Sequence, residues 1–142
     1  LSDRWTLSGT YSHVSENWFP IEGSSPIALN APGDKATVGI AYRDAASGLS
    51  GTARLRYTGA YPFLSTDFAG TRCIPDAPTT DFQEDCIEEY ALFDLTLGYR
   101  IPSTTATVQL GVTNLLNTSY RSFVGAPETG RLAMLRVRYQ LF

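Results

Sequence analysis

The sequence predicts an all-β fold, an antiparallel up-and-down transmembrane β-barrel segment of about six strands. Apolar and polar residues alternate over segments of roughly ten residues, the period of a strand that faces two different environments. The connections between these segments are alternately long and short, and aromatic residues gather near both ends of the apolar side. A soluble sandwich needs strands of only about 5 to 6 residues and no aromatic rims.

The bulk composition excludes membrane-spanning helices but not strands. The chain has 142 residues, about one domain's worth, and 43% of them are hydrophobic. Its mean hydropathy is -0.11, and it has no apolar run near the roughly 18 residues that a spanning helix requires. A barrel hides its apolar residues at every second position, so mean hydropathy does not test for one. The chain begins at Leu1 without a signal peptide, which predicts a processed product or an excised piece.

The first three strands are predicted from alternation in the first half of the chain. In the first, Trp5, Leu7 and Tyr11 alternate with small hydroxyl residues. The second and third set Val, Ile, Leu and Tyr against Lys, Arg and Thr in the same way. The predicted ranges are Arg4 to Val14, Lys35 to Asp44 and about Leu49 to Tyr61.

The last three strands follow the same rule. Phe93, Leu95 and Leu97 alternate with Leu92, Asp94 and Thr96 in the fourth strand. The final pair sets Val and Leu against Thr, Gln and Arg. The predicted ranges are Ala91 to Ile101, Thr105 to Val112 and Met134 to Leu141.

The connections predict a meander with two unlike ends. Tight turns at Ala45 to Gly48 and Pro102 to Thr104 make their flanking strands antiparallel neighbours. The long loops, Ser15 to Asp34, Pro62 to Glu89 and Asn114 to Gly130, then all lie at the opposite end. Pro62, Pro75 and Pro78 argue against regular structure in the second loop. Outer-membrane barrels have this arrangement, with long extracellular loops and short periplasmic turns.

The two sides of the predicted sheet have opposite character. Aromatic residues mark the apolar side near the short turns (Trp5, Tyr42, Tyr99, Tyr139) and near the long loops (Tyr11, Tyr61, Phe93), as two girdles. The polar side carries the residues predicted to face the lumen, namely Arg43, Arg54, Arg56, Arg100, Arg136 and Arg138, together with Lys35 and Asp94. The alternative is that these side chains are solvated on the outer face of a soluble sheet.

The second long loop is acidic and contains both cysteines. Between Thr66 and Tyr90 there are seven acids and one cation, Arg72. The spacing of Cys73 and Cys86 predicts a local disulfide in an oxidising compartment, with two free thiols as the alternative. No histidine or third cysteine lies nearby, so a zinc site is not predicted. The carboxylates lack regular ligand spacing and are expected to be solvated, although cation binding stays open.

Sequence motifs support binding rather than catalysis. His13 is the only histidine, and no catalytic, cofactor or metal-ligand pattern accompanies it, so an enzyme is not expected. The basic residues are dispersed along strands, which excludes a nucleic-acid interface. Loop aromatics that could contact a small ligand are Trp18, Phe19, Tyr120 and Phe123, with packing among loops as the alternative. Asn114 and Asn117 are expected to cap the fifth strand or form Asx turns.

Several motifs in this order resemble those of one family. The chain closes on VTNLLNTSY followed by VGAPETGRLAMLRVRYQLF, and upstream contains NAPGDKATVGIAYRD and YALFDLTLGYRI. This pattern resembles the C-terminal strands of TonB-dependent outer-membrane receptors and covers nearly all 142 residues. One departure is Phe142, which falls out of phase with Tyr139 and Leu141 and so differs from the family's terminal aromatic residue.

The resemblance implies what the whole protein would be. Such receptors are barrels of about 22 strands, filled by an N-terminal plug domain. They lie in the outer membrane of Gram-negative bacteria and import iron chelates, cobalamin or glycans with energy coupled through TonB. Residues 1–142 would then be the C-terminal barrel portion without the plug, and the lumenal arginines would brace the plug. The alternatives are a soluble β-sandwich binding domain and a porin without a plug.

Overall fold

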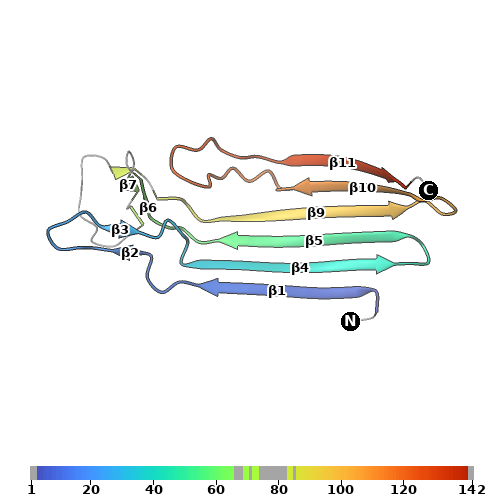
Figure 1. Ribbon diagram of the computed structural model, residues 1–142, viewed down its shortest axis with the longest axis horizontal. Helices are drawn as coiled ribbons and strands as arrows, with labels where there is room; N and C mark the ends of the chain where they lie inside the picture. Colours follow the sequence, from blue (N-terminus) through green and yellow to red (C-terminus); the bar gives the residue numbers. More distant parts are fainter. Residues whose placement is uncertain (1–2, 66–68, 71, 74–82, 85, 141–142) are drawn as a thin grey trace.

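A computed structural model describes residues 3–65, 69–70, 72–73, 83–84 and 86–140. Six strands form one antiparallel sheet in the order β1-β4-β5-β9-β10-β11, in which sequence neighbours are also spatial neighbours. The strands are β1 (Trp5–His13), β4 (Asp34–Asp44), β5 (Leu49–Thr58), β9 (Tyr90–Arg100), β10 (Ala106–Thr113) and β11 (Leu132–Tyr139). Figure 1 shows the long loops together at one end, and the tight turns, the start of β1 and the end of β11 at the other.

The structure confirms the predicted meander and adjusts some strand ends. β5 stops at Thr58 rather than near Tyr61, because Gly59 donates its N–H to the Asp34 carbonyl (2.9 Å) and closes that ladder. β11 begins at Leu132, two positions before the predicted start. Within the described residues, no helix is long and apolar enough to cross a membrane. The phase of Phe142 lies outside the described residues.

Short strands in the long loops were not predicted from the sequence. β2 (Trp18–Phe19) pairs with β3 (Ile27–Ala28), and β6 (Phe63–Leu64), β7 (Ala69–Gly70) and β8 (Gln83–Glu84) form a second small sheet. The expectation that prolines keep the second loop irregular was therefore wrong for these segments. Pro62 directly precedes β6, where its missing N–H interrupts no ladder. Pro75 and Pro78 lie outside the described residues.

The turn between β4 and β5 depends on its first and last residues. The Asp44 carboxylate accepts hydrogen bonds from the Ala46 N–H (3.2 Å) and the Ser47 hydroxyl (2.9 Å). Gly48 adopts a φ of 75°, which favours glycine, and a Cβ there would lie 2.6 Å from the Arg100 carbonyl oxygen. This position therefore requires glycine.

Strand register gives the sheet two unlike faces. Residues paired across strands share a face. One apolar row consists of Trp5, Tyr42, Gly51, Leu97, Leu110 and Leu135. One polar row consists of Arg43, Ser50, Gly98, Gln109 and Arg136. The alternation predicted from sequence is thus continuous across the sheet.

The apolar face is bare. Leu7, Leu135 and Val137 are 60%, 68% and 66% exposed, and no second sheet packs on this face in the described part of the chain. Soluble monomers rarely leave so large a contiguous apolar surface in water. A β-sandwich would cover this face, so the architecture does not fit the soluble alternative.

The aromatic girdles form only in part. At the short-turn end, Trp5 and Tyr42 are direct cross-strand partners with ring centroids 4.7 Å apart, and Tyr99 and Tyr139 are exposed on the same face. At the other end, the placement predicted for Tyr61 is wrong. Tyr61 lies beyond β5 and is only 6% exposed, because it packs into a cluster of loop residues.

Candidate ligand site at the loop end

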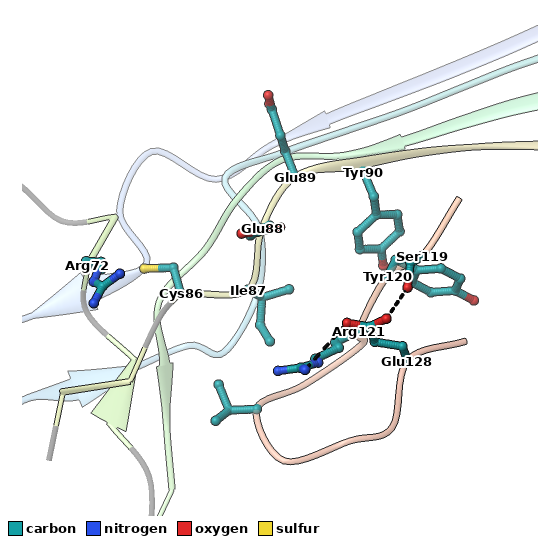
Figure 2. A pocket seen from close by; sticks show the side chains of 11 residues that line it. Arg72, Cys86, Ile87, Glu88, Glu89, Tyr90, Ser119, Tyr120, Arg121 and Glu128 are labelled. Atoms are coloured by element: carbon teal, nitrogen blue, oxygen red, sulfur yellow. Dashed lines mark hydrogen bonds and ion pairs between the residues drawn. The ribbon is translucent and has the colours of Figure 1, made fainter. Parts of the chain in front are cut away.

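A pocket of about 470 Å³ lies where the chain enters β9 and where the β10–β11 loop folds back against it. Residues 86–90 form one wall, Arg72 contributes from the neighbouring loop segment, and Ser119, Tyr120, Arg121, Val124 and Glu128 form the other wall. Figure 2 shows Tyr90 and Glu89 pointing to opposite sides of their segment, with Tyr90 on the side of Tyr120. Thr58, the strand partner of Tyr90, is paired in turn with Lys35, so Tyr90 belongs to the polar face. The β10–β11 loop therefore leans over the polar face of the sheet.

A small apolar cluster supports this pocket. Tyr61, Ile87 and Val124 are buried together, and the backbones of Tyr61 and Ile87 exchange two hydrogen bonds of 3.1 Å. The Tyr61 hydroxyl donates to the Ser122 carbonyl (2.6 Å), which ties the second long loop to the third. Burial, and secondarily the nearby Tyr90, raises the pKa of Tyr61 above its usual value, so this hydroxyl remains a donor at neutral pH.

The first long loop joins the same assembly through one side chain. Asn30, at a φ of 53°, donates its side-chain N–H to the Leu64 carbonyl and accepts from the Leu64 N–H, both at 2.8 Å. Its amide thereby bonds the backbone of β6, which is an outer strand of the sheet β6-β7-β8. Phe63, next to Leu64, stacks on Phe123 with ring centroids 6.3 Å apart. The segment from Tyr61 to Leu64 thus contacts both other long loops.

The lining of the pocket combines aromatic and charged groups. The Tyr90 and Tyr120 rings lie 4.6 Å apart. Glu128 accepts from the Ser119 hydroxyl and forms a single 3.5 Å contact with the Arg121 guanidinium. Because Arg121 and Glu128 are more than half exposed, this ion pair contributes only about 0 to 1 kcal/mol. Arg121 can therefore exchange this partner for an anionic ligand at small cost.

Two asparagines close the base of the β10–β11 loop. Asn114 is 1% exposed, and its side chain bonds both the N–H (2.9 Å) and the carbonyl (2.7 Å) of Thr118. The Asn117 side-chain oxygen accepts from the Arg131 N–H across the loop (2.9 Å). Both residues have φ near 55°, a conformation that asparagine tolerates. The expected capping role is confirmed for Asn114, which bonds Thr118 four residues on rather than the backbone two residues on, as an Asx turn would. The Asn117 bond links the NLLN motif to the later Gly-Arg pair.

An ion pair on the polar face anchors the same loop. Arg56 donates to both carboxylate oxygens of Asp94, at 2.7 and 3.1 Å. The oxygen at the longer distance also accepts the Asn114 N–H (3.0 Å). The Asp94 side chain is 21% exposed and that of Arg56 38%, so the pair is only partly screened by solvent. Asp94 thus connects β5, β9 and the start of the loop.

Replacing Asp94 by alanine is expected to destabilise the folded protein by about 1 to 3 kcal/mol, because Arg56 and the Asn114 N–H lose their shared acceptor. The urea midpoint of the detergent-solubilised protein measures this loss. A double-mutant cycle with Arg56→Ala should give a coupling energy of about 1 kcal/mol or more. Additive effects of the two substitutions would show that the pair does not anchor the loop.

The structure brings together only part of the predicted ligand-contacting set. Tyr120 lines the pocket, whereas Phe123 packs on Phe63 at its margin. Trp18 and Phe19 lie half-buried in β2, in a different loop. Arg121 and Glu128 were not predicted from the sequence as pocket residues. Both lie in the predicted loop from Asn114 to Gly130, and Arg121 directly follows Tyr120. The predicted lumenal residues Arg43, Arg54, Arg56, Arg100, Arg136 and Arg138 all lie on the polar face by register.

The predicted disulfide is confirmed. Cys73 and Cys86 are bonded, with their Cα atoms 5.6 Å apart, and Cys86 lines the pocket beside Ile87. Among the described residues, no group of three His, Cys, Asp or Glu side chains could hold a metal ion. Asp67, Asp76, Asp81 and Asp85 of the acidic loop lie outside that part of the chain, so cation binding there stays untested.

Comparison with known proteins identifies the family of this fold. The model of the "TonB dependent receptor-like, beta-barrel" family matches residues 1–115. The Rhizobactin receptor of Rhizobium meliloti (strain 1021) is 30% identical in an alignment 120 residues long, which covers 76% of this chain and 16% of that protein.

Two solved structures share the fold. The structure of the FpvAI–pyocin S2 complex matches with a TM-score of 0.69 and 18% identity, over 98% of this chain and 17% of that chain. The closed form of the ferric-catecholate import receptor Fiu from K12 E. coli matches with a TM-score of 0.66 and 20% identity, over 96% of this chain and 19% of that chain. The chain thus spans less than a fifth of the length of each of these proteins.

In these structures the six-stranded sheet corresponds to a segment of a larger β-barrel. Receptors of this kind lie in the outer membrane of Gram-negative bacteria, and the bare apolar face and meander topology are those of a transmembrane barrel. The chain belongs to the TonB-dependent receptor family and is part of its outer-membrane β-barrel.

Proposed function

We propose that this chain is the C-terminal barrel portion of a receptor that imports a ferric chelate with energy from the TonB system. The observation that carries the proposal is the pocket between β9 and the β10–β11 loop, lined by a contacting pair of tyrosine rings and the weakly held Arg121. An iron chelate offers flat or apolar surface to aromatic rings and negative charge to a guanidinium. The names of the rhizobactin and ferric-catecholate receptors favour this ligand class over cobalamin or glycans.

The two faces of the sheet fit opposite surroundings in this proposal. The apolar face contacts lipid, because Leu, Val and Tyr side chains cover it. The polar face lines the barrel interior, where the N-terminal plug of the same protein would pack. The long-loop end, with its disulfide and pocket, then lies outside the cell, in the oxidising environment that a disulfide requires.

Binding of ferric rhizobactin and of a ferric catecholate to the detergent-solubilised receptor tests the proposal. We expect one of them to bind, and Arg121→Glu to weaken that binding about tenfold or more, since a charge-assisted hydrogen bond is replaced by repulsion. Arg131→Glu is the matched control, because Arg131 is exposed on the same loop but does not line the pocket. The proposal fails if neither chelate binds, or if the two variants bind it equally well.

A further inference from the structure

We propose that the β2–β3 hairpin of the first long loop packs its apolar face against the long loop that precedes β1 in the full-length protein. This inference rests on the proposed function in one respect, since it requires the whole receptor barrel of which this sheet is a segment. It requires no particular ligand. It assigns a partner within the same protein to an exposed apolar surface that the pocket does not use.

Residues 14–33, which form the first long loop, are more apolar than a water-exposed loop requires. Glu16 and Glu22 are their only charged residues. Ile21, Ile27 and Leu29 are 42%, 54% and 50% exposed. Scattered apolar side chains on a surface are ordinary, whereas neighbouring ones mark an interaction site. The arrangement of these side chains therefore decides whether they form one surface.

The hairpin gathers these side chains on one face. Phe19 is the cross-strand partner of Ile27. The Leu29 N–H donates to the Asn17 carbonyl (3.0 Å), which extends the same pairing by one step. Because alternate positions on paired strands share a face, Phe19, Ile27 and Leu29 lie on the same side of the hairpin. The first long loop thus presents a continuous apolar face.

One side of the hairpin is already occupied. β3 lies against β6 of the second long loop, and the two hydrogen bonds between Asn30 and Leu64 fix this contact. Among the described strands, β2 pairs only with β3, and Figure 1 shows β3 between β2 and β6. The open side of the hairpin is therefore the β2 side, away from the other long loops of this chain.

The order of the loop contacts identifies the partner. The first long loop packs on the second through Asn30, and the second packs on the third through Phe63 and Phe123. Each loop thus contacts the loop of the neighbouring strands. β1 is the outermost strand of the described sheet, and in a larger barrel another strand pairs with its free edge. That strand runs antiparallel to β1 and starts at the loop end, so the long loop leading into it lies beside the hairpin.

The chemistry of the face favours this partner over an anionic ligand. Residues 14–33 contain no lysine or arginine, so the face offers no positive charge to a chelate. The pocket that contains Arg121 lies beside β9, and β4 and β5 separate β9 from β1. Apolar side chains of a neighbouring loop would complement the face without burying an unpaired charge. The preceding loop is therefore expected to supply aliphatic or aromatic residues.

Cysteine labelling in the full-length receptor measures whether the face is covered. Ile27→Cys and Leu116→Cys place thiols at positions that are 54% and 72% exposed here, and Leu116, in the β10–β11 loop, does not line the pocket. Without chelate, a hydrophilic maleimide is expected to label position 27 about tenfold or more slowly than position 116, because the preceding loop has to open first. Equal labelling rates would overturn the proposal.

Hydrogen exchange identifies the covering segment. The double variant Ile27→Asp/Leu29→Asp is expected to raise amide exchange in the loop preceding β1 about tenfold or more, since carboxylates would lose water in an apolar contact. Leu116→Asp is the matched control and should leave exchange of that loop unchanged. Peptides from the β4–β5 ladder should keep their wild-type rates, which shows that the barrel is folded. Should the double variant not fold, Ile27→Ala/Leu29→Ala decides, with a smaller increase expected.

Other occupants of the face give different results. If exchange of the preceding loop is unchanged while chelate affinity falls, the hairpin contacts the ligand and the proposal is overturned. If position 27 is protected only at receptor concentrations that form dimers, a second copy covers the face, which overturns it as well. Labelling and exchange are both measured without chelate. A receptor that binds no ferric chelate would therefore refute the proposed function but not this contact.

Discussion

Replacing Tyr61 by alanine is expected to speed amide hydrogen exchange at residues 61 and 87 by roughly 100-fold. Tyr61 is buried against Ile87 and Val124, and truncation of a buried aromatic side chain costs about 3 kcal/mol or more. The two backbone hydrogen bonds between residues 61 and 87 should then open more often, because the packing that protects them is gone. Exchange mass spectrometry of the full-length receptor measures the effect.

Two comparisons make the Tyr61 result specific. Tyr61→Phe keeps the ring and loses only the hydroxyl that bonds the Ser122 carbonyl, so we expect about a tenfold increase, which corresponds to one hydrogen bond. Peptides from the β4–β5 ladder should exchange at the wild-type rate in both variants, since the cluster lies outside it. Equal exchange of Tyr61→Ala and wild type would show that Tyr61 does not hold the loops together.

Removing the disulfide is expected to loosen the pocket wall to a similar extent. The bond closes a loop with a sequence separation of 13, and on the chain-entropy model a loop of this size contributes about 3 kcal/mol. Cys86 directly precedes Ile87, so the double variant Cys73→Ser/Cys86→Ser should raise exchange at residues 86–90. Chelate affinity should fall in parallel, because these residues line the pocket.

Reductant provides the matched control for the disulfide. Treating the wild type with a phosphine reductant should reproduce the exchange and affinity of the serine variant, and the variant itself should not respond. If the variant binds chelate as tightly as the oxidised wild type, the disulfide does not organise the pocket. A response of the serine variant to reductant would point to an effect unrelated to this bond.

The strands were predictable from the sequence because each follows from a local pattern. A side chain at every second position faces the same way whatever the rest of the chain does, so alternation identified the strands and both faces, including the arginine face. Antiparallel pairing of strand neighbours followed from the tight turns, as at Asp44 to Gly48. The disulfide was predictable because its two cysteines are the only pair and lie close in sequence.

The loop assembly was not predictable in the same way. Asn30 bonds Leu64 across 34 positions, and Tyr61 bonds Ser122 across 61 positions. Neither contact produces a periodic pattern of residue types in the sequence, because each is a single hydrogen bond between one side chain and one backbone group. For this reason Tyr61 was assigned to an aromatic rim, and Arg121 and Glu128 were not recognised as pocket residues.

The sequence by itself thus determined the β-barrel architecture, the apolar and polar sides, the disulfide and the family resemblance. Each of these depends on residues that are close in the sequence or on the order of motifs along the chain. Only the tertiary structure decided which loop residues meet, where the pocket lies and which apolar residues of the first long loop share a face. Those features depend on distances between segments far apart in the chain, which strand pairing and loop closure set together.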